Sequence, residues 1–188
     1  MATTGDIKNG LCIEFNNDLF TVVQFQHVKP GKGGAFVRTK LKSLTNGRVI
    51  ENTFSAGHKI NVTKIERRPY QFLYGDDSGF TFMHNENFEQ ITIQREMVEN
   101  SDLMKEGQTV EAVFHVDTET VLSVEIPPFV ELEVTYTEPG IKGDTSSGNA
   151  LKPATVDTGA TIMVPLFINN GEKIRIDTRD RTYYERVK

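Results

Sequence analysis

Short runs of alternating apolar and polar residues cover most of the chain, and turn-forming residues separate them. In the first third, residues 11–15 and 19–28 flank a turn at residues 16–18, and residues 35–41 follow a glycine-rich loop. A period of two places every second side chain on one face of a sheet and predicts β-strands. Five such strands in residues 1–65 are typical of a small closed barrel, in which strand edges pair off.

Two further units show the same alternation. In the second unit, strands are predicted at residues 70–74, 80–83, 91–93, 110–116 and 120–126, with a short helix over 97–105 that ends near Gly107. In the third unit, strands are predicted at residues 130–137, 160–168 and 173–177, with a polar loop over 138–149. Both units have the length of five-stranded OB barrels.

Domain boundaries follow from the breaks in this pattern. Pro127 and Pro128 cannot both sit inside a paired strand, because proline has no backbone N–H to donate, so a boundary is predicted there. The first barrel is expected to end at Ile65. We therefore expect three domains, at residues 1–65, 66–128 and 129–188.

Composition places the chain among ordinary soluble proteins, with 37% hydrophobic and 25% charged residues. No stretch approaches the roughly 18 uncharged apolar residues of a membrane-spanning helix. The first residues lack a basic region followed by an apolar core, so no signal peptide is expected. A soluble cytoplasmic protein without membrane contact is the default expectation.

Charge is distributed unevenly. Residues 1–65 carry nine Lys or Arg against four Asp or Glu, whereas residues 66–128 carry four against thirteen and residues 129–188 eight against nine. A basic first unit on an acidic body favours a polyanion partner at one end of the chain. Differences in net charge of this size between segments also arise by chance, so the asymmetry by itself does not establish a polyanion partner.

Metal and disulfide chemistry has little support. Cys12 is the one cysteine, which excludes an intrachain disulfide and a cysteine-based zinc site. The four histidines are far apart in sequence and form no local ligand pair. No metal and no cofactor are expected.

The segment from Lys29 to Gly34 carries the most information. Strong alternation on both sides predicts the tip of a hairpin, with one proline, three glycines and the cationic arm of Lys32. A phosphate-binding Walker loop needs a lysine followed by Ser or Thr at the start of a helix, which is absent here. A flexible hairpin with a solvated lysine is the simplest interpretation. A Schiff-base lysine needs a desolvated pocket, and a glycine-rich tip is the opposite environment.

Aromatic residues alternate through the start of the second unit. They could stack bases, but the acidic balance of this unit favours a role in the barrel core. The members of this stripe are Tyr70, Phe72, Tyr74, Phe80 and Phe82. The carboxylates of the same unit are interpreted as solvated acids and not as an acid–base pair.

A resemblance to a known family covers the whole chain. The hairpin segment Lys29 to Phe36 resembles the functional loop of bacterial elongation factor P, and the C-terminal third matches the family signature K-x-A-x4-G-x2-[LIV]-x-V-P-x2-[LIV]-x2-G without departure. The matching positions are Lys152, Ala154, Gly159, Ile162, Val164, Pro165, Ile168 and Gly171. The resemblance implies an all-β fold, with an N-terminal SH3-like (KOW-type) barrel, two OB-fold barrels and an elongated, tRNA-like shape.

The resemblance also implies a function. Members are translation elongation factors that bind the 70S ribosome beside the peptidyl-tRNA and rescue synthesis stalled at consecutive prolines. They act by binding and not as enzymes. Implied partners are the ribosome, peptidyl-tRNA, ribosomal RNA and, because many members carry a β-lysyl or aminopentanol group on the tip lysine, a lysine-modifying enzyme. A monomer is expected.

Site residues carry over position by position. Lys32 matches the tip residue that reaches the CCA end of the tRNA, and Pro30, Gly31, Gly33 and Gly34 form its loop. Residues implied to contact tRNA or mRNA in the last domain are Gly143, Asp144, Thr145, Tyr183 and Arg186. Two alternatives stay open from the residues alone: a generic OB-fold protein that binds single-stranded RNA, and a lysine-dependent enzyme.

Overall fold

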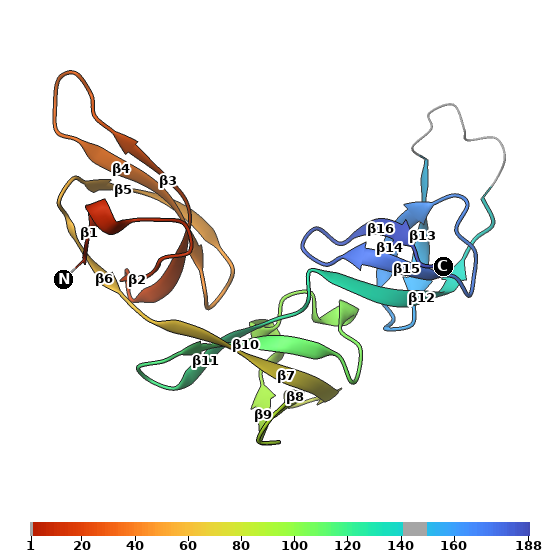
Figure 1. The fold of residues 1–188 in the computed structure, drawn as a ribbon. Helices are drawn as coiled ribbons and strands as arrows, with labels where there is room; N and C mark the ends of the chain where they lie inside the picture. The colour runs from red at the N-terminus through yellow and green to blue at the C-terminus, as the bar shows by residue number, and fades with distance from the viewer. Residues whose placement is uncertain (1, 141–149) are drawn as a thin grey trace. The chain divides into compact units, whose positions relative to one another are not determined.

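The computed structural model describes residues 2–140 and 150–188, and these residues form an almost entirely β structure (Figure 1). They form three sheets, with strand orders β1-β6-β2-β3-β4-β5, β11-β10-β7-β8-β9 and β14-β13-β12-β15-β16. The first is an SH3-like barrel and the other two have the strand order of OB barrels, so the expected fold class is confirmed. None of the described helices is long and apolar enough to cross a membrane.

The strands of the first sheet are β1 Ala2–Thr3, β2 Cys12–Phe15, β3 Asp18–Val28, β4 Phe36–Ser43, β5 Val49–Ser55 and β6 Lys59–Val62. Those of the second are β7 Ile65–Asp76, β8 Gly79–His84, β9 Gln90–Ile93, β10 Thr109–His115 and β11 Thr120–Glu125. Those of the third are β12 Phe129–Thr137, β13 Leu151–Val156, β14 Thr161–Pro165, β15 Lys173–Asp177 and β16 Thr182–Arg186. Three 3₁₀ turns complete the elements: η1 Thr4–Asp6, η2 Arg95–Met97 and η3 Ser101–Leu103.

The chain divides into two compact units. One comprises Met1–Pro69 with Glu111–Glu125, and the other Tyr70–Val110 with Ile126–Lys188. The division into domains 1–65, 66–128 and 129–188 is a different partition, based on breaks in the sequence pattern, and stays a prediction.

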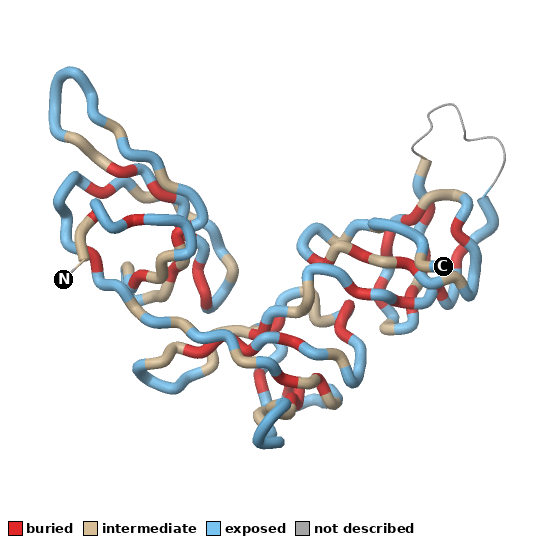
Figure 2. The backbone as a smooth tube through the Cα atoms, in the orientation of Figure 1, coloured by how far each residue is buried: buried red, intermediate tan, exposed pale blue. Residues whose placement is uncertain are grey.

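The first barrel closes because its outermost strands meet. Thr4, next to β1, is 1% exposed; its hydroxyl donates to the Ser55 carbonyl at the end of β5 (3.3 Å) and accepts from the Gly57 N–H (2.8 Å). Closure removes exposed strand edges and surrounds an apolar core. Figure 2 shows the alternation of buried and exposed positions along these strands. The core residues are Ile7, Ile13, Phe20, Val22, Val37, Leu41, Phe54 and Ile60.

The aromatic stripe of the second barrel is core at four of its five positions, as the sequence favoured. Tyr70, Phe72, Phe80 and Phe82 are at most 7% exposed. Tyr74 differs, at 47% exposed. The pairing of β7 with β8 shifts between Phe72 and Tyr74, so one extra residue reverses the alternation and turns Tyr74 outward.

The helix predicted over residues 97–105 does not form. The 3₁₀ turns η2 and η3 occupy this stretch, and Asn100 between them has a φ of 55°. A residue in the left-handed region cannot continue a right-handed helix. The prediction of a helix over residues 97–105 is therefore wrong.

The third barrel contains a strand that the sequence pattern missed. β13 includes Pro153, which pairs with Met163 of β14, and proline usually argues against a strand between two neighbours. The β13 side chains nevertheless alternate, with Lys152, Ala154 and Val156 buried. The buried core is Leu103, Val130, Leu132, Val134, Ala154, Val156, Ala160, Ile162, Val164, Ile168, Ile174 and Ile176.

Gly79, at the start of β8, lies where no side chain fits. Its φ is +141°, and a Cβ built there would lie 2.2 Å from the Ile93 carbonyl oxygen of β9. We expect Gly79→Ala to lower the free energy of unfolding by about 3 kcal/mol, because strand β9 must move and the backbone is strained. Urea unfolding followed by far-UV circular dichroism measures the loss.

Gly107 is the matched control in the same barrel. It also has a positive φ, +82°, but the nearest atom to an added Cβ is 3.9 Å away. Gly107→Ala should therefore lower the free energy of unfolding by only about 1 kcal/mol, the cost of placing a side-chain-bearing residue at a positive φ. Equal losses in the two variants would contradict the steric account.

Candidate functional site

The lysine-bearing segment stands at the tip of the hairpin of β3 and β4. The last pair of this ladder is Val28 with Phe36, so residues 29–35 form the connection. Residues 29–34 are all exposed. In Figures 1 and 2 this tip projects beyond the rest of its own sheet. The structure thus has the hairpin that the sequence predicts, with Lys32 in the middle of its connection.

The tip is narrow because most of its residues have small side chains. A Cβ added at Gly31 or Gly34 would meet no atom within 4 Å, so nothing packs against the loop there. Gly33 has a φ of +109°, a conformation that side-chain-bearing residues rarely adopt. Among the described residues, Lys32 has no hydrogen-bond or ion-pair partner. The amine is therefore a single cationic group on a thin support.

A β-bulge interrupts the β3–β4 hairpin that carries this tip. The pairing of β3 with β4 shifts between Val22 and Gln24, so Val23 is an extra residue. Val22 is fully buried, whereas Gln24 and Gln26 beyond the bulge are exposed. On the other face, the rings of Phe25 and His27 lie 5.5 Å apart, edge to face. Core packing continues past the bulge, since Phe25 and Val37 still pack in the first barrel, and the hairpin becomes fully exposed only at residues 29–34.

A row of cations runs along the outer face of β4, from the arm to the barrel. Arg38, Lys40 and Lys42 are all exposed, because the alternating residues Val37, Thr39 and Leu41 point into the core. Lys40 forms an exposed ion pair with Glu51 of β5 (Nζ–Oε1 3.6 Å). Exposed ion pairs of this kind are weak, so the row keeps its positive character. This basic row is a surface suited to phosphate groups.

The C-terminal positions of the sequence prediction are found on β16. Tyr183 is half-buried and packs against the core of the third barrel, and burial raises its pKa. Arg186 is exposed, donates to Glu172 (Nη1–Oε1 3.0 Å) and lies 5.9 Å from the centre of the Phe167 ring. Gly143, Asp144 and Thr145 lie outside the described residues.

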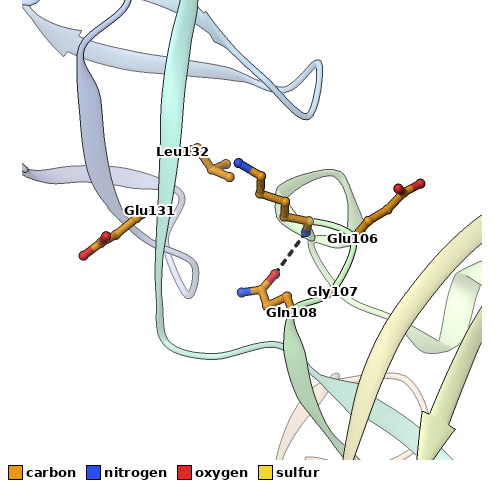
Figure 3. Close-up of a pocket in the computed structure, with 6 residues that line it drawn as sticks. Glu106, Gly107, Gln108, Glu131 and Leu132 are labelled. Atoms are coloured by element: carbon orange, nitrogen blue, oxygen red, sulfur yellow. Dashed lines mark hydrogen bonds between the residues drawn. The ribbon is translucent and has the colours of Figure 1, made fainter.

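An open pocket of about 320 Å³ lies within the second compact unit (Figure 3). It is lined by Lys105, Glu106, Gly107, Gln108, Glu131 and Leu132. The Lys105 ammonium is already held by Asp157 (Nζ–Oδ2 2.7 Å), and the Lys105 backbone N–H donates to Gln108. The two glutamates point away from each other. No set of polar groups converges on one ligand atom, as a small-molecule site requires.

Metal binding gains no support from the described part of the chain. Over residues 2–140 and 150–188, no three His, Cys, Asp or Glu side chains are grouped so that they could hold an ion. No residue role in this site needs one.

Sequence reasoning missed the basic row as a surface. The excess of Lys and Arg in residues 1–65 is evident from the sequence, but those charges were not assigned to the outer face of one strand. The signal was present, because Arg38, Lys40 and Lys42 fall on alternate positions of one predicted strand. Their common direction could have been predicted from strand periodicity alone.

Comparison with known proteins adds family evidence over nearly the whole chain. Three family models match: an elongation factor P KOW-like domain at residues 3–60, an elongation factor P OB domain at 65–124, and the elongation factor P C-terminal domain at 130–186. Elongation factor P of Amoebophilus asiaticus is 62% identical over all of this chain and 98% of its own length. Elongation factor P 1 of Porphyromonas gingivalis is 55% identical over the full length of both chains.

A solved structure supports the fold. The structure described as eukaryotic translation initiation factor 5A from Methanococcus jannaschii is similar with a TM-score of 0.52, at 22% identity, over 65% of this chain and 92% of its own. At this identity the likeness concerns architecture only.

The contact between Arg186 and Glu172 gives a prediction about pKa. The Asn169 backbone N–H donates to Glu172 (2.8 Å) and, with the smaller effect of Arg186, lowers the pKa of this carboxyl below its usual value. We expect Arg186→Ala to raise the Glu172 pKa only part of the way back, because the Asn169 amide remains. Carboxyl ¹³C NMR titration measures it.

The sign of the linked effect on stability follows from the lowered pKa. The Glu172 carboxylate stabilises the fold at pH values above the pKa of a glutamate in the unfolded chain, about 4.3. This contribution is lost as the pH falls through the lower pKa that Glu172 has in the folded chain. A Glu172 titration that Arg186→Ala leaves unchanged would mean that the ion pair does not persist in solution.

Proposed function

The chain belongs to the elongation factor P family, and we propose that it binds the ribosome beside the peptidyl-tRNA and promotes peptide-bond formation at stalled sites. The observation that carries the proposal is the exposed hairpin connection with Lys32 between glycines. Only a thin, weakly packed support can bring one amine into a narrow space lined by RNA. The partners are the 70S ribosome, ribosomal RNA and the CCA end of the peptidyl-tRNA.

Stalling at consecutive prolines has a physical cause that such an arm can address. The proline ring fixes φ and constrains the attacking nitrogen. Poor alignment of reactants is expensive, since alignment can be worth up to about 7–11 kcal/mol of barrier. An arm that holds the tRNA end in place restores part of this alignment without transferring a proton. The protein is therefore proposed to act as a binding factor and not as an enzyme.

The exposed position of Lys32 is also consistent with its enzymatic extension. Its amine has no described partner that a modifying enzyme would have to displace. A longer arm would reach further from the same support. We propose a monomeric factor that acts in the cytoplasm, where its ribosome partner is, with further RNA contacts at Gly143, Asp144, Thr145, Tyr183 and Arg186.

The basic row gives the proposal its electrostatic component. Arg38, Lys40 and Lys42 lie on the same hairpin as Lys32, so phosphate contacts along β4 would hold the arm against RNA. A generic protein that binds single-stranded RNA is less favoured, because its contacts would not require a bare lysine tip. Lysine-dependent catalysis is also less favoured, since an exposed tip cannot desolvate the amine.

The first functional prediction concerns Lys32. Lys32→Ala should reduce synthesis through consecutive prolines to the rate seen without the factor, because the aligning amine is lost. Its fold should remain intact, since the side chain is exposed and forms no hydrogen bond or ion pair with a described residue. A reconstituted translation assay on a template with consecutive prolines measures the rate.

Lys29→Ala is the matched control, as it removes the same charge from the same exposed connection. It should retain most of the activity. Full activity of Lys32→Ala, or equal loss in both variants, would count against a specific role for the tip amine.

The second functional prediction concerns salt. Replacing Arg38, Lys40 and Lys42 by Ala should weaken ribosome binding and reduce the slope of log K against log salt by roughly 2 to 3, since each lost phosphate contact contributes roughly 0.7–0.9. Sedimentation with ribosomes over a salt series measures it.

Glu51→Gln is the control, because it removes a negative charge where the triple substitution removes positive ones. It removes the carboxylate that pairs with Lys40 and should leave binding as strong or stronger. A slope that the triple substitution does not alter would place the phosphate contacts elsewhere.

A further inference from the structure

An exposed aromatic pair on the third barrel has no role in the function proposed so far. Phe129 begins β12 and Tyr184 lies on β16, with ring centres 4.8 Å apart and planes inclined by 54°. Phe129 is 37% exposed and Tyr184 57% exposed. Rings of this size are normally turned inward, and a paired exposed set often marks a binding surface.

A β-bulge turns Tyr184 outward. Arg175 of β15 pairs with Glu185, but the next residue, Ile176, pairs with Tyr183, so Tyr184 is one residue more than the ladder needs. Tyr183 packs against the core, and Tyr184 is left on the outer face beside Phe129. Bulges commonly redirect a side chain next to a functional site.

The loop between β15 and β16 adds a guanidinium to the two rings. Arg179 lies with its Cζ 5.3 Å from the centre of the Phe129 ring. The loop is fixed at its base, because Thr178 is 3% exposed and donates from its hydroxyl to Pro127 O (2.6 Å) and from its N–H to Pro128 O (2.9 Å). The cluster is thus organised before any ligand binds, which limits the entropy lost on binding.

The electrostatics of the cluster favour a neutral, planar ligand. Asp177 binds the Arg179 guanidinium (Nε–Oδ1 2.9 Å), so the charge of the arginine is balanced. On the same face, Arg175 pairs with both Glu131 and Glu185. These ion pairs border the rings and confine the apolar area. An extended apolar peptide would have to desolvate them, whereas a single flat ring would not.

We propose that Phe129, Tyr184 and Arg179 form a stacking site for one unpaired base of RNA. The inference rests on the proposed function, which brings the protein to RNA. It adds a second kind of contact, because stacking on these rings needs no phosphate and is independent of the basic row. In OB folds the loop between the fourth and fifth strands, here the loop that carries Arg179, commonly contacts oligonucleotides.

Ribosome binding over a salt series tests the stacking site. Tyr184→Ala and Phe129→Ala should each weaken binding about tenfold or more, the effect expected from one lost stacked base. Neither should change the slope of log K against log salt, since no phosphate contact is removed. Tyr184→Phe should bind like the parent chain, because it keeps the ring.

Tyr136→Ala is the matched control. Tyr136 lies on the same barrel, is 59% exposed and is not part of the aromatic pair. It should bind like the parent chain. Parent-like binding by Tyr184→Ala would overturn the stacking site, as would equal losses in Tyr184→Ala and Tyr136→Ala.

A direct fluorescence measurement separates this inference from the proposed function. The chain has no tryptophan, so Tyr184→Trp introduces a single reporter. A single-stranded oligoribonucleotide should quench its fluorescence, and an abasic strand of the same length and charge should not. Failure of the parent chain to bind ribosomes would reject the proposed function alone, while quenching would still support the stacking site.

Three fluorescence results would overturn the stacking site. Equal quenching by the abasic strand would show that phosphate, not a base, is recognised. A change that depends on protein concentration without RNA would assign the surface to contact between copies of the chain. Absence of quenching by the oligoribonucleotide, in a variant with parent-like circular dichroism, would also reject it.

Discussion

Backbone hydrogen bonds hold each strand of this protein to its neighbours, and the pleat then sends successive side chains to opposite faces. Because the sheets close around apolar cores, one face of each strand is committed to packing. Everything that meets a partner must come from the other face, from a connection or from a break in the alternation. The basic row on β4 comes from the other face of a strand. The tip with Lys32 comes from a connection, and Tyr184 comes from a break in the alternation.

The proposed contacts divide the work of binding between different forces. The basic row offers long-range attraction that is sensitive to salt, and the aromatic pair offers short-range stacking that is not. Neither requires precise placement of a reactive group. In the proposed function, precise placement is left to the narrow tip, where the amine of Lys32 has no described partner. In the proposed function, affinity and the alignment of the reactants therefore come from separate parts of the molecule.

Particular residues show how far the sequence reached. The alternation around residues 16–18 and 29–34 predicted the hairpins, and both exist as connections between paired strands. The prediction that Tyr74 lies in the core was wrong, because an extra residue after Phe72 turns its side chain outward. A bulge leaves no mark in composition. β13 was missed because Pro153 resembles a strand breaker until its neighbours are known.

Local sequence was enough to predict the all-β class, the strand-rich units and the lysine between glycines, because periodicity and turn chemistry act over a few residues. Three features became visible only in the folded chain: which barrel edges meet, where the bulges fall, and the grouping of Phe129, Arg179 and Tyr184. Those features depend on pairing between strands far apart in the chain. Local sequence does not contain the register of such pairs, and one residue of register exchanges the buried face for the exposed one.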